Sequence, residues 1–440
     1  MKSELFPGDK LRKLIIPLIM DQLLMVLVGM AGTVMVASVG ETAVSGVSLV
    51  DTLNTLVITL LTGLSTGGAV LCAHYMGSNN KDEAANVLKH MLIIGLGVSV
   101  CFMGVFSLGG RGLLGIIFGQ VEETVLDNAS VYFKIVTLSF PFLGIYTGCT
   151  AVLRGTGNSR LPMIVSAIMN GINIAGNAIL LYGLGLGVEG VAIPALVSRI
   201  AAAVIMLAIL CRPGLEVQIN NIKVRWNKDI ITRILRVGIP GSLEMSIFQI
   251  GKILVLGLIA RLGTTAITAN AIGNTLNSFQ ALPEDAIGLA LITVVGACLG
   301  AGEKEQAVQY TRKLLKMAYV SMWVINILVF AGAPVIARFF ALSAETAGAA
   351  IHIIRFNCLF AITIWPLAFA LPNALKGAYD VKYPLLVSLF SMWVFRVGLS
   401  YLAVTFFDAS IYMLYVCFAL DWIFRAIMFG GRFLSKKWLC

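Results

Sequence analysis

The chain has few charged residues for its size. Only 12% of its 440 residues are Asp, Glu, Lys or Arg, about half of the share found in soluble globular proteins. Hydrophobic residues make up 58%, and the mean hydropathy is +0.92. This composition excludes an ordinary water-soluble fold and indicates that most of the chain contacts lipid.

Several motifs that would indicate an enzyme or a pump are absent from the sequence. There is no Walker A sequence, which argues against an ATP-driven pump, and the three histidines are scattered along the chain. No two of the eight cysteines form a C-x-x-C motif, so we expect them to be small core residues. The segment "GLGVEG" from Gly185 matches G-x-G-x-x-G but follows no predicted strand. We therefore expect no nucleotide, no metal, no cofactor and no enzymatic activity.

Long apolar runs recur along the whole chain, and each is long enough to cross a bilayer as a helix. The first run is too long for a signal peptide and has no clear cleavage site, so we interpret it as the first span. The pattern predicts an all-α polytopic membrane protein with 12 transmembrane helices, near residues 14–37, 44–76, 91–118, 131–153, 162–182, 188–211, 237–261, 267–300, 315–340, 349–372, 384–407 and 410–431.

The distribution of basic residues predicts the orientation of these spans. With the N-terminus in the cytoplasm, most of the 32 Lys and Arg residues fall in inward-facing segments, and only Arg111, Arg261 and Arg338 fall in outward-facing ones. The positive-inside rule thus explains the net charge of +10 without a nucleic-acid partner. We expect a multi-pass protein of the plasma (cytoplasmic) membrane, monomeric, with both termini in the cytoplasm.

The two halves of the chain are related by a repeat. With a shift of 223 residues, "GETAVSGVSLVDTLNTL" from Gly40 aligns with "GTTAITANAIGNTLNSF" from Gly263, and with a shift of 222, "LRGTGNSRLP" from Leu153 aligns with "LKGAYDVKYP" from Leu375. Six spans return the chain to its starting side, so the repeat is parallel, as in some secondary transporters. The predicted lobes are residues 1–211 and 237–440, joined by a cytoplasmic connector at 212–236.

The sequence resembles the multidrug and toxic compound extrusion (MATE) family of transporters. The resemblance rests on "VLRGTGNSRLPM", "NGINIAGN", "YGLGLGVEGVAIPALVSR", "ARLGTTAITANAI", "VGACLGAGEKEQA" and "LPNALKGAYDVKYPL", and it extends over nearly the whole chain. It implies a 12-helix antiporter that exports organic cations and other amphiphiles while sodium ions or protons move inward. Many members have an acid in the first helix where this chain has Gly32, and the tenth span here lacks the acid of one branch. The coupling residues therefore stay open.

Acidic residues inside the spans are the main candidates for ion coupling. A carboxylate at bilayer depth costs about 3 kcal/mol on insertion scales and usually faces a cavity or a partner. Asp21 and Glu244 each stand four residues after a proline in the first helix of a half, and 21 plus 223 is 244. Either acid could instead be structural, capping backbone groups or pairing with Arg or Lys. The further candidates are Asp51, Glu284, Asp285 and Lys252.

Other polar and aromatic residues of the spans are candidates for the substrate cavity. They are Asn54, Asn277, Gln249, Arg396, Phe279 and Trp365. We expect Lys252 to pair with Glu284 or Asp285, either as a structural link or in coupling, and Asp421 to pair with Arg425 at the i, i+4 spacing. Arg396 requires a partner on another helix, whereas Lys134 and Arg199 are expected to reach the membrane surface from helix ends.

Together these observations favour a secondary active antiporter that exports organic cations or drugs in exchange for sodium ions or protons by alternating access. Two alternatives stay open. One is a flippase for lipid-linked saccharide from a related superfamily, which should have an unusually basic cavity. The other is a membrane-embedded enzyme or sensor, for which the sequence shows neither a catalytic constellation nor a soluble domain. The expected partners are small amphiphilic or cationic substrates and the lipid bilayer.

Overall fold

The computed structural model describes residues 4–118, 122–219, 225–339, 344–407 and 409–439. Over these residues the chain is helical and contains no strand. In a bilayer only helices or closed barrels can pair every backbone polar group internally, so the apolar runs become helices. Among the described residues, 11 helices are long and apolar enough to span a membrane, or 12 if one bent pair counts as a single span. The predicted all-α, 12-span fold class is confirmed.

The chain forms two compact units. The N-unit is Ile16–Ser242, and the C-unit is Met1–Ile15 together with Leu243–Cys440. They differ from the predicted lobes in two places: the first 15 residues belong to the C-unit, and residues up to 242 belong to the N-unit. The predicted connector is also partly helical, because α8 begins at Lys228. The predicted lobe boundaries stay a prediction.

The N-unit is organised around one central helix. α2 (Glu41–Gly77) packs against α3 (Lys81–Phe118), α4 (Glu123–Thr137) and α5 (Phe140–Gly155). α6 (Arg160–Ala178) continues into a short π-helical segment, η1 (Ile179–Gly183), and pairs with α7 (Glu189–Leu210). Apolar side chains of α2, α4 and α7 form the core at one end of the unit.

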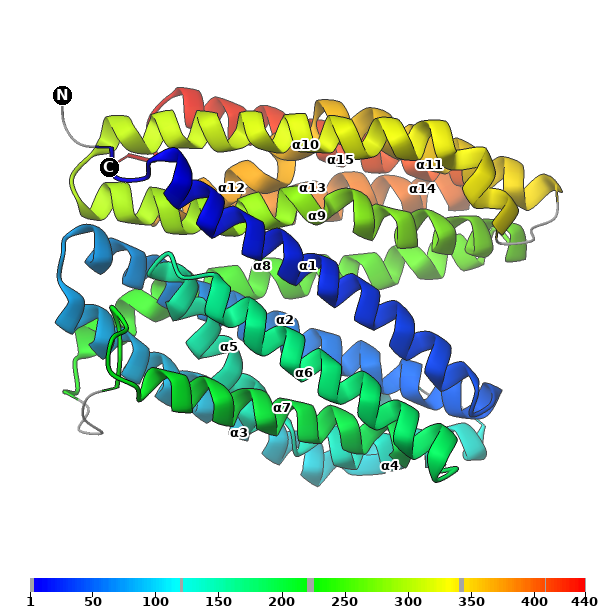
Figure 1. The fold of residues 1–440 in the computed structure, drawn as a ribbon. Coiled ribbons are helices and arrows are strands. Elements are labelled where there is room, and N and C mark those ends of the chain that lie inside the picture. Colours follow the sequence, from blue (N-terminus) through cyan, green and yellow to red (C-terminus); the bar gives the residue numbers. More distant parts are fainter. Residues whose placement is uncertain (1–3, 119–121, 220–224, 340–343, 408, 440) are drawn as a thin grey trace. The chain divides into compact units, whose positions relative to one another are not determined.

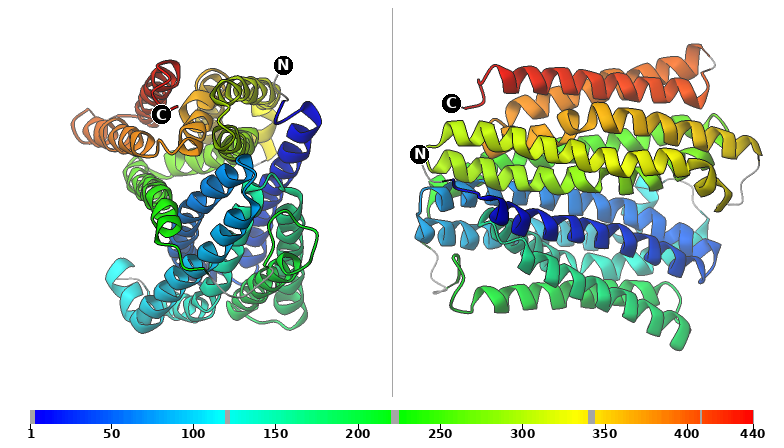
Figure 2. Two further views of the ribbon diagram at one scale, coloured as in Figure 1. Left: turned by 90° about the vertical axis from the view of Figure 1, so that its left-hand side faces the viewer. Right: turned by 45° about the horizontal axis from the view of Figure 1, so that its top comes forward.

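The C-unit repeats this arrangement with more breaks in its helices. α9 (Thr264–Gly300) is central and packs against α10 (Lys304–Phe339), α11 (Ala344–Thr363) and α12 (Leu371–Gly377), as Figure 1 shows. η2 (Pro366–Ala370) precedes α12. The next span combines α13 (Lys382–Ser391), η3 (Met392–Leu399) and α14 (Ser400–Phe406), and α15 (Ile411–Leu434) ends the unit. The start of α1 and the end of α15 lie at the same end of the C-unit (Figure 2).

The first helix of each half passes from one unit into the other at a proline. α1 (Gly8–Ala37) leaves the C-unit after Ile15, next to Pro17, and α8 (Lys228–Ala260) leaves the N-unit after Ser242, next to Pro240. The two prolines are equivalent in the repeat, since 17 plus 223 is 240. A proline inside a helix removes a backbone hydrogen bond and favours a bend. In each half, the helix therefore lacks a backbone hydrogen bond close to the residue at which it changes unit.

Backbone geometry also follows the repeat. Positive φ angles occur at Gly40 and Gly263 (123° and 96°) and at Gly157 and Tyr379 (87° and 62°). Each pair has equivalent positions at the shifts of 223 and 222 residues. Both halves thus turn at the same places, although one of the four positions has a tyrosine instead of glycine. Five of the cysteines are buried, while Cys101 and Cys211 are exposed and Cys440 lies outside the described residues.

Candidate functional site

Asp21 of α1 forms a buried ion pair within the N-unit. Its Oδ2 lies 2.5 Å from Nη2 of Arg154, near the end of α5. Asp21 is 2% exposed, and its Oδ1 has no hydrogen-bond partner among the described residues. Because both charges are removed from bulk water, losing either partner would leave an uncompensated charge in the helix bundle.

Glu244 of α8 forms the equivalent pair within the C-unit. Its Oε2 lies 2.9 Å from Nζ of Lys376 on α12, and Ser388 of α13 donates a hydrogen bond of 3.0 Å to its Oε1. The two bases are related by the repeat, because 154 plus 222 is 376. The structure therefore builds the same acid–base pair twice. The bases could have been found from the sequence, since both lie in the aligned segments that begin at Leu153 and Leu375.

The N-unit contains a polar cluster between α2, α4 and α7. The hydroxyl of Tyr132 donates to Oδ1 of Asp51 at 3.0 Å. Arg199 donates to Oδ1 of Asn54 at 3.2 Å and to the hydroxyl of Ser139 at 2.6 Å. Ser139 lies at the 50° bend that separates α4 from α5, immediately before α5 begins. The cluster combines one acid and one base with neutral hydrogen-bonding groups.

The expectation for Arg199 is wrong. We predicted that it lies near a helix end and extends to the membrane surface, but it stands near the middle of α7 and bonds to side chains of neighbouring elements. A guanidinium near the middle of a span needs internal acceptors, because lipid offers none. Lys134 does lie in the last turn of α4 and is exposed.

The C-unit contains a larger charged cluster. Asp421 is fully buried, with Oδ1 2.8 Å from Nε of Arg425 and Oδ2 3.1 Å from Nε of Arg396. Arg425 also donates to the backbone oxygen and hydroxyl of Ser388, at 3.2 and 3.4 Å. The predicted i, i+4 pair of Asp421 and Arg425 is confirmed. The same carboxylate is the partner that Arg396 required on another helix.

Three cations of the C-unit lie close to one aromatic ring. The centroid of Phe248 lies 5.5 Å from Nζ of Lys252, 5.4 Å from Cζ of Arg396 and 5.1 Å from Cζ of Arg425. The face of an aromatic ring attracts cations. Lys252 is exposed, although it stands within the span formed by α8.

The predicted pair of Lys252 with Glu284 or Asp285 does not form. No ion pair within 4.0 Å joins them among the described residues, although Lys252 and Asp285 are close enough for their charges to interact. The two acids differ in surroundings: Glu284 is 4% exposed, while Asp285 is exposed. Adjacent residues of a helix point about 100° apart, which separates the buried Glu284 from the exposed Asp285.

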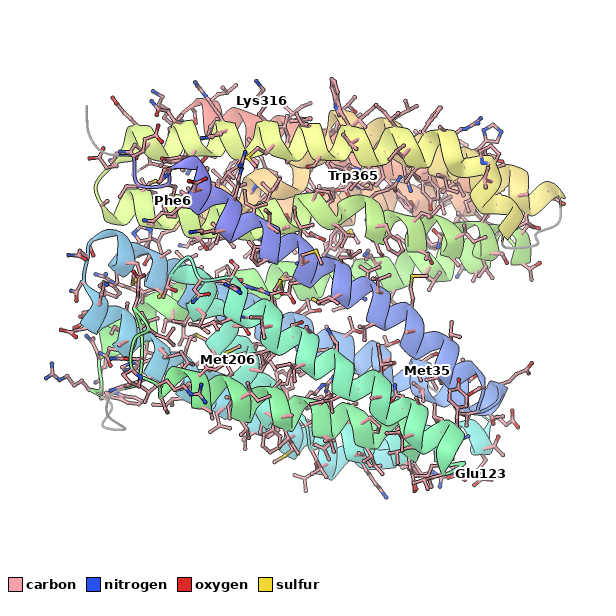
Figure 3. All side chains as sticks on the ribbon, viewed as in Figure 1. Phe6, Met35, Glu123, Met206, Lys316 and Trp365 are labelled. Carbon is pink, nitrogen blue, oxygen red and sulfur yellow. The ribbon has the colours of Figure 1, made fainter. Side chains whose placement is uncertain are left out.

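The remaining candidates lie on several elements of the C-unit. Asn277 and Phe279 of α9 and Gln249 of α8 are half-buried, and Oδ1 of Asn277 has no hydrogen-bond partner among the described residues. Trp365, labelled in Figure 3, is buried and packs against Trp422 with ring centroids 5.4 Å apart. Trp365 is therefore part of the core of the C-unit. Across the described residues, no group of three or more His, Cys, Asp or Glu side chains could hold a metal ion.

Comparisons with known proteins agree with this architecture. The MatE family model matches residues 17–179 and 240–402, one match in each half. A probable multidrug resistance protein NorM of Thermotoga maritima is 24% identical over 98% of this chain and 92% of its own length. A probable multidrug resistance protein YoeA of Bacillus subtilis is 25% identical over 88% and 85%.

Solved structures show the same fold at lower identity. A multidrug resistance MATE family transporter of the MOP superfamily, in an outward-facing conformation, has a TM-score of 0.90 and 21% identity over 97% of this chain and 96% of its own. A MOP superfamily transporter from Pyrococcus furiosus, described as having a binding pocket of reverse polarity, has a TM-score of 0.91 and 20% identity over 99% and 97%. With both halves matched by the family model, the chain belongs to the MatE family of membrane transporters.

Proposed function

We propose that this protein is a secondary active antiporter that exports small cationic or amphiphilic compounds, drugs among them, in exchange for sodium ions or protons by alternating access. The family match in both halves and the multidrug resistance names of its relatives support this proposal. The alternative of a membrane-embedded enzyme or sensor is not retained, because the family is one of transporters.

The observation that carries the proposal is the repeated acid–base pair. Asp21 and Glu244 lie four residues beyond the prolines at which α1 and α8 change unit. A proton or sodium ion that binds such a carboxylate competes with its basic partner, Arg154 or Lys376. Ion binding would therefore release the helix segment beyond the proline from its own unit. This links occupation by the ion to a change in helix position, as antiport requires.

Glu244 gives the first test. Glu244→Gln cannot hold a coupling cation and loses its ion pair with Lys376, so it should abolish ion-driven efflux of ethidium from proteoliposomes while expression stays intact. Glu305→Gln, at an exposed position in the first turn of α10, is the matched control and should transport normally. Undiminished efflux by Glu244→Gln would remove this residue from the mechanism.

Asp21 gives the second test. Asp21→Asn should impair efflux as well, since its pair with Arg154 occupies the equivalent position. Wild-type efflux in this variant would make the repeated pair a structural feature. Running both variants under a sodium gradient and under a proton gradient identifies the coupling ion. The gradient that drives wild-type efflux, and fails to do so in the variants, is the coupling gradient.

A flippase for lipid-linked saccharide stays the alternative, and the three cations around Phe248 favour it because a pyrophosphate needs basic partners. Exposed Asp285, close to Lys252, opposes it. If the protein moves a fluorescent lipid pyrophosphate across the membrane of vesicles without any ion gradient, a flippase would replace the antiporter as the proposed function. The location in the plasma membrane, the monomeric state and the cytoplasmic position of both termini belong to the same proposal, and reporter fusions at each terminus test the last of these.

A further inference from the structure

Lys252 is an exposed cation inside a membrane span. Eight residues separate it from the end of α8 at Ala260, which corresponds to about 12 Å of helix. A charged side chain at such a depth is not stable against lipid and faces a water-filled cavity or a partner. No anionic partner lies within 4.0 Å among the described residues, so the exposed side chain of Lys252 is open to water or to a ligand.

The charge around Phe248 is not balanced by the acids that contact it. Lys252, Arg396 and Arg425 all lie within 5.5 Å of the ring centroid. Asp421 uses one oxygen for each arginine, and so compensates one of the three positive charges. Asp285 lies within electrostatic reach of Lys252 but forms no ion pair within 4.0 Å with it. The surroundings of Phe248 therefore keep an excess of positive charge.

Arg396 also has hydrogen-bond donors that no protein group uses. A guanidinium carries five N–H donors. Its Nε contacts Asp421, and across the described part of the chain its Nη atoms form no hydrogen bond, although the residue is only 7% exposed. Its guanidinium instead lies 4.8 Å from the centroid of Phe418 and 5.6 Å from that of Trp422. Unlike Nε, these Nη atoms are not fully buried, so an acceptor from outside the chain can reach them.

We infer that Lys252 and Arg396 form a subsite for an anionic group of the substrate, a carboxylate, sulfonate or phosphate carried by an amphiphilic molecule. The oxygens of such a group accept hydrogen bonds from both cations, and Phe248 and Phe418 offer aromatic surface to its apolar part. Lys252 and Phe248 stand at i and i+4 on one face of α8, so the ring holds the ammonium in place. The inference extends the proposed export function from pure cations to amphiphiles that also carry a negative charge.

Two dyes that differ by one carboxylate test the inference. Rhodamine 110 carries a carboxylate where rhodamine 123 carries its methyl ester. Fluorescence anisotropy detects the binding of either dye, because a bound dye rotates more slowly than a free one. We expect the purified full-length protein to bind rhodamine 110 more tightly. Lys252→Gln should weaken binding of rhodamine 110 about tenfold, while rhodamine 123 changes less than about twofold. Lys252→Arg should retain the preference.

Controls separate this subsite from a loss of folding. Lys316→Gln changes an exposed lysine of α10 (Figure 3) and should leave both affinities unchanged. Competition in the wild-type protein needs no variant: hexanesulfonate should displace rhodamine 110 at lower concentration than hexyltrimethylammonium. Equal affinity for the two dyes, equal losses in Lys252→Gln, or stronger competition by the ammonium compound would overturn the inference. If the protein exports ethidium but binds both dyes equally, only the subsite is rejected. If it prefers rhodamine 110 but does not export ethidium, only the export function is rejected.

Discussion

The N-unit and the C-unit share a repeat but differ in their buried charges. Both hold a first-helix acid against a base at the equivalent position, Asp21 with Arg154 and Glu244 with Lys376. Beyond this pair, the N-unit places one arginine, Arg199, among ready acceptors. The C-unit places two arginines on one buried aspartate and leaves a lysine exposed.

This difference separates two kinds of role. A feature that both units retain at repeat-equivalent positions serves what both halves must do, which is to hold a helix that changes unit at a proline. A feature found in one unit alone is free to serve the substrate. We propose that the repeated ion pair is of the first kind and that the cations around Phe248 are of the second.

The largest difference is expected when the central acid of each unit is removed. Asp421→Asn leaves Arg396 and Arg425 buried without a negative partner, and breaking a buried ion pair in this way costs about 3 to 5 kcal/mol. Asp51→Asn should cost far less, because Tyr132 can still donate to the amide oxygen and Arg199 keeps Asn54 and Ser139. The apparent melting temperature of each purified variant measures the difference.

Double replacement of Arg396 and Arg425 by Met in the Asp421→Asn background removes the unpaired charges, and should recover part of the lost stability. If Asp421→Asn melts at the same temperature as the wild type, or if Asp51→Asn is the less stable variant, the stability of the C-unit does not depend more on its central acid than that of the N-unit does.

The large-scale organisation could be predicted because it depends on hydropathy and on the repeat. Runs of apolar residues must become helices in lipid, and every predicted span overlaps one of the observed helices or broken helices. The acids at positions 21 and 244 were found for the same reason, since a charge inside an apolar run is visible without a structure. The roles of these site residues stay a prediction.

Partners on other helices that the repeat does not mark could not be predicted, because spacing along the chain says little about contacts between helices. Asp421 and Arg425 were found from their i, i+4 spacing, but Arg396 comes from the preceding span. The expected pair of Lys252 with Glu284 or Asp285 failed for the same reason: all three lie within their spans, yet the rotation of α8 and α9 decides which groups meet.

A smaller difference is expected at two glycines where helices approach closely. A Cβ added at Gly155 would lie 2.7 Å from the backbone oxygen of Ala69, whereas one at Gly377 would lie 3.1 Å from that of Ile292. Gly155→Ala should therefore cost about 1 to 3 kcal/mol through overpacking against a rigid backbone. At Gly377 a shift of a few tenths of an ångström suffices, so Gly377→Ala should cost less than Gly155→Ala.

Melting temperatures of the two alanine variants, measured side by side, test this order. Because the two glycines are equivalent in the repeat, each variant is the matched control of the other. A lower melting temperature for Gly377→Ala than for Gly155→Ala would show that the tighter contact lies in the C-unit.

The smallest difference is expected at the turns that follow α2 and α9. Asn79 has φ of 58° and Gly302, its repeat equivalent, has φ of 77°. Their backbone N–H groups donate to Met76 and Leu299, which are also equivalent. Asparagine tolerates this left-handed conformation better than other residues with a side chain. Asn79→Gly and Gly302→Asn should each change stability by less than about 1 kcal/mol, whereas Gly302→Val should cost about 1 to 2 kcal/mol because a β-branched residue is strained there. Melting curves in which Gly302→Asn loses as much as Gly302→Val would mean that space at this turn, and not its backbone conformation, distinguishes the two units.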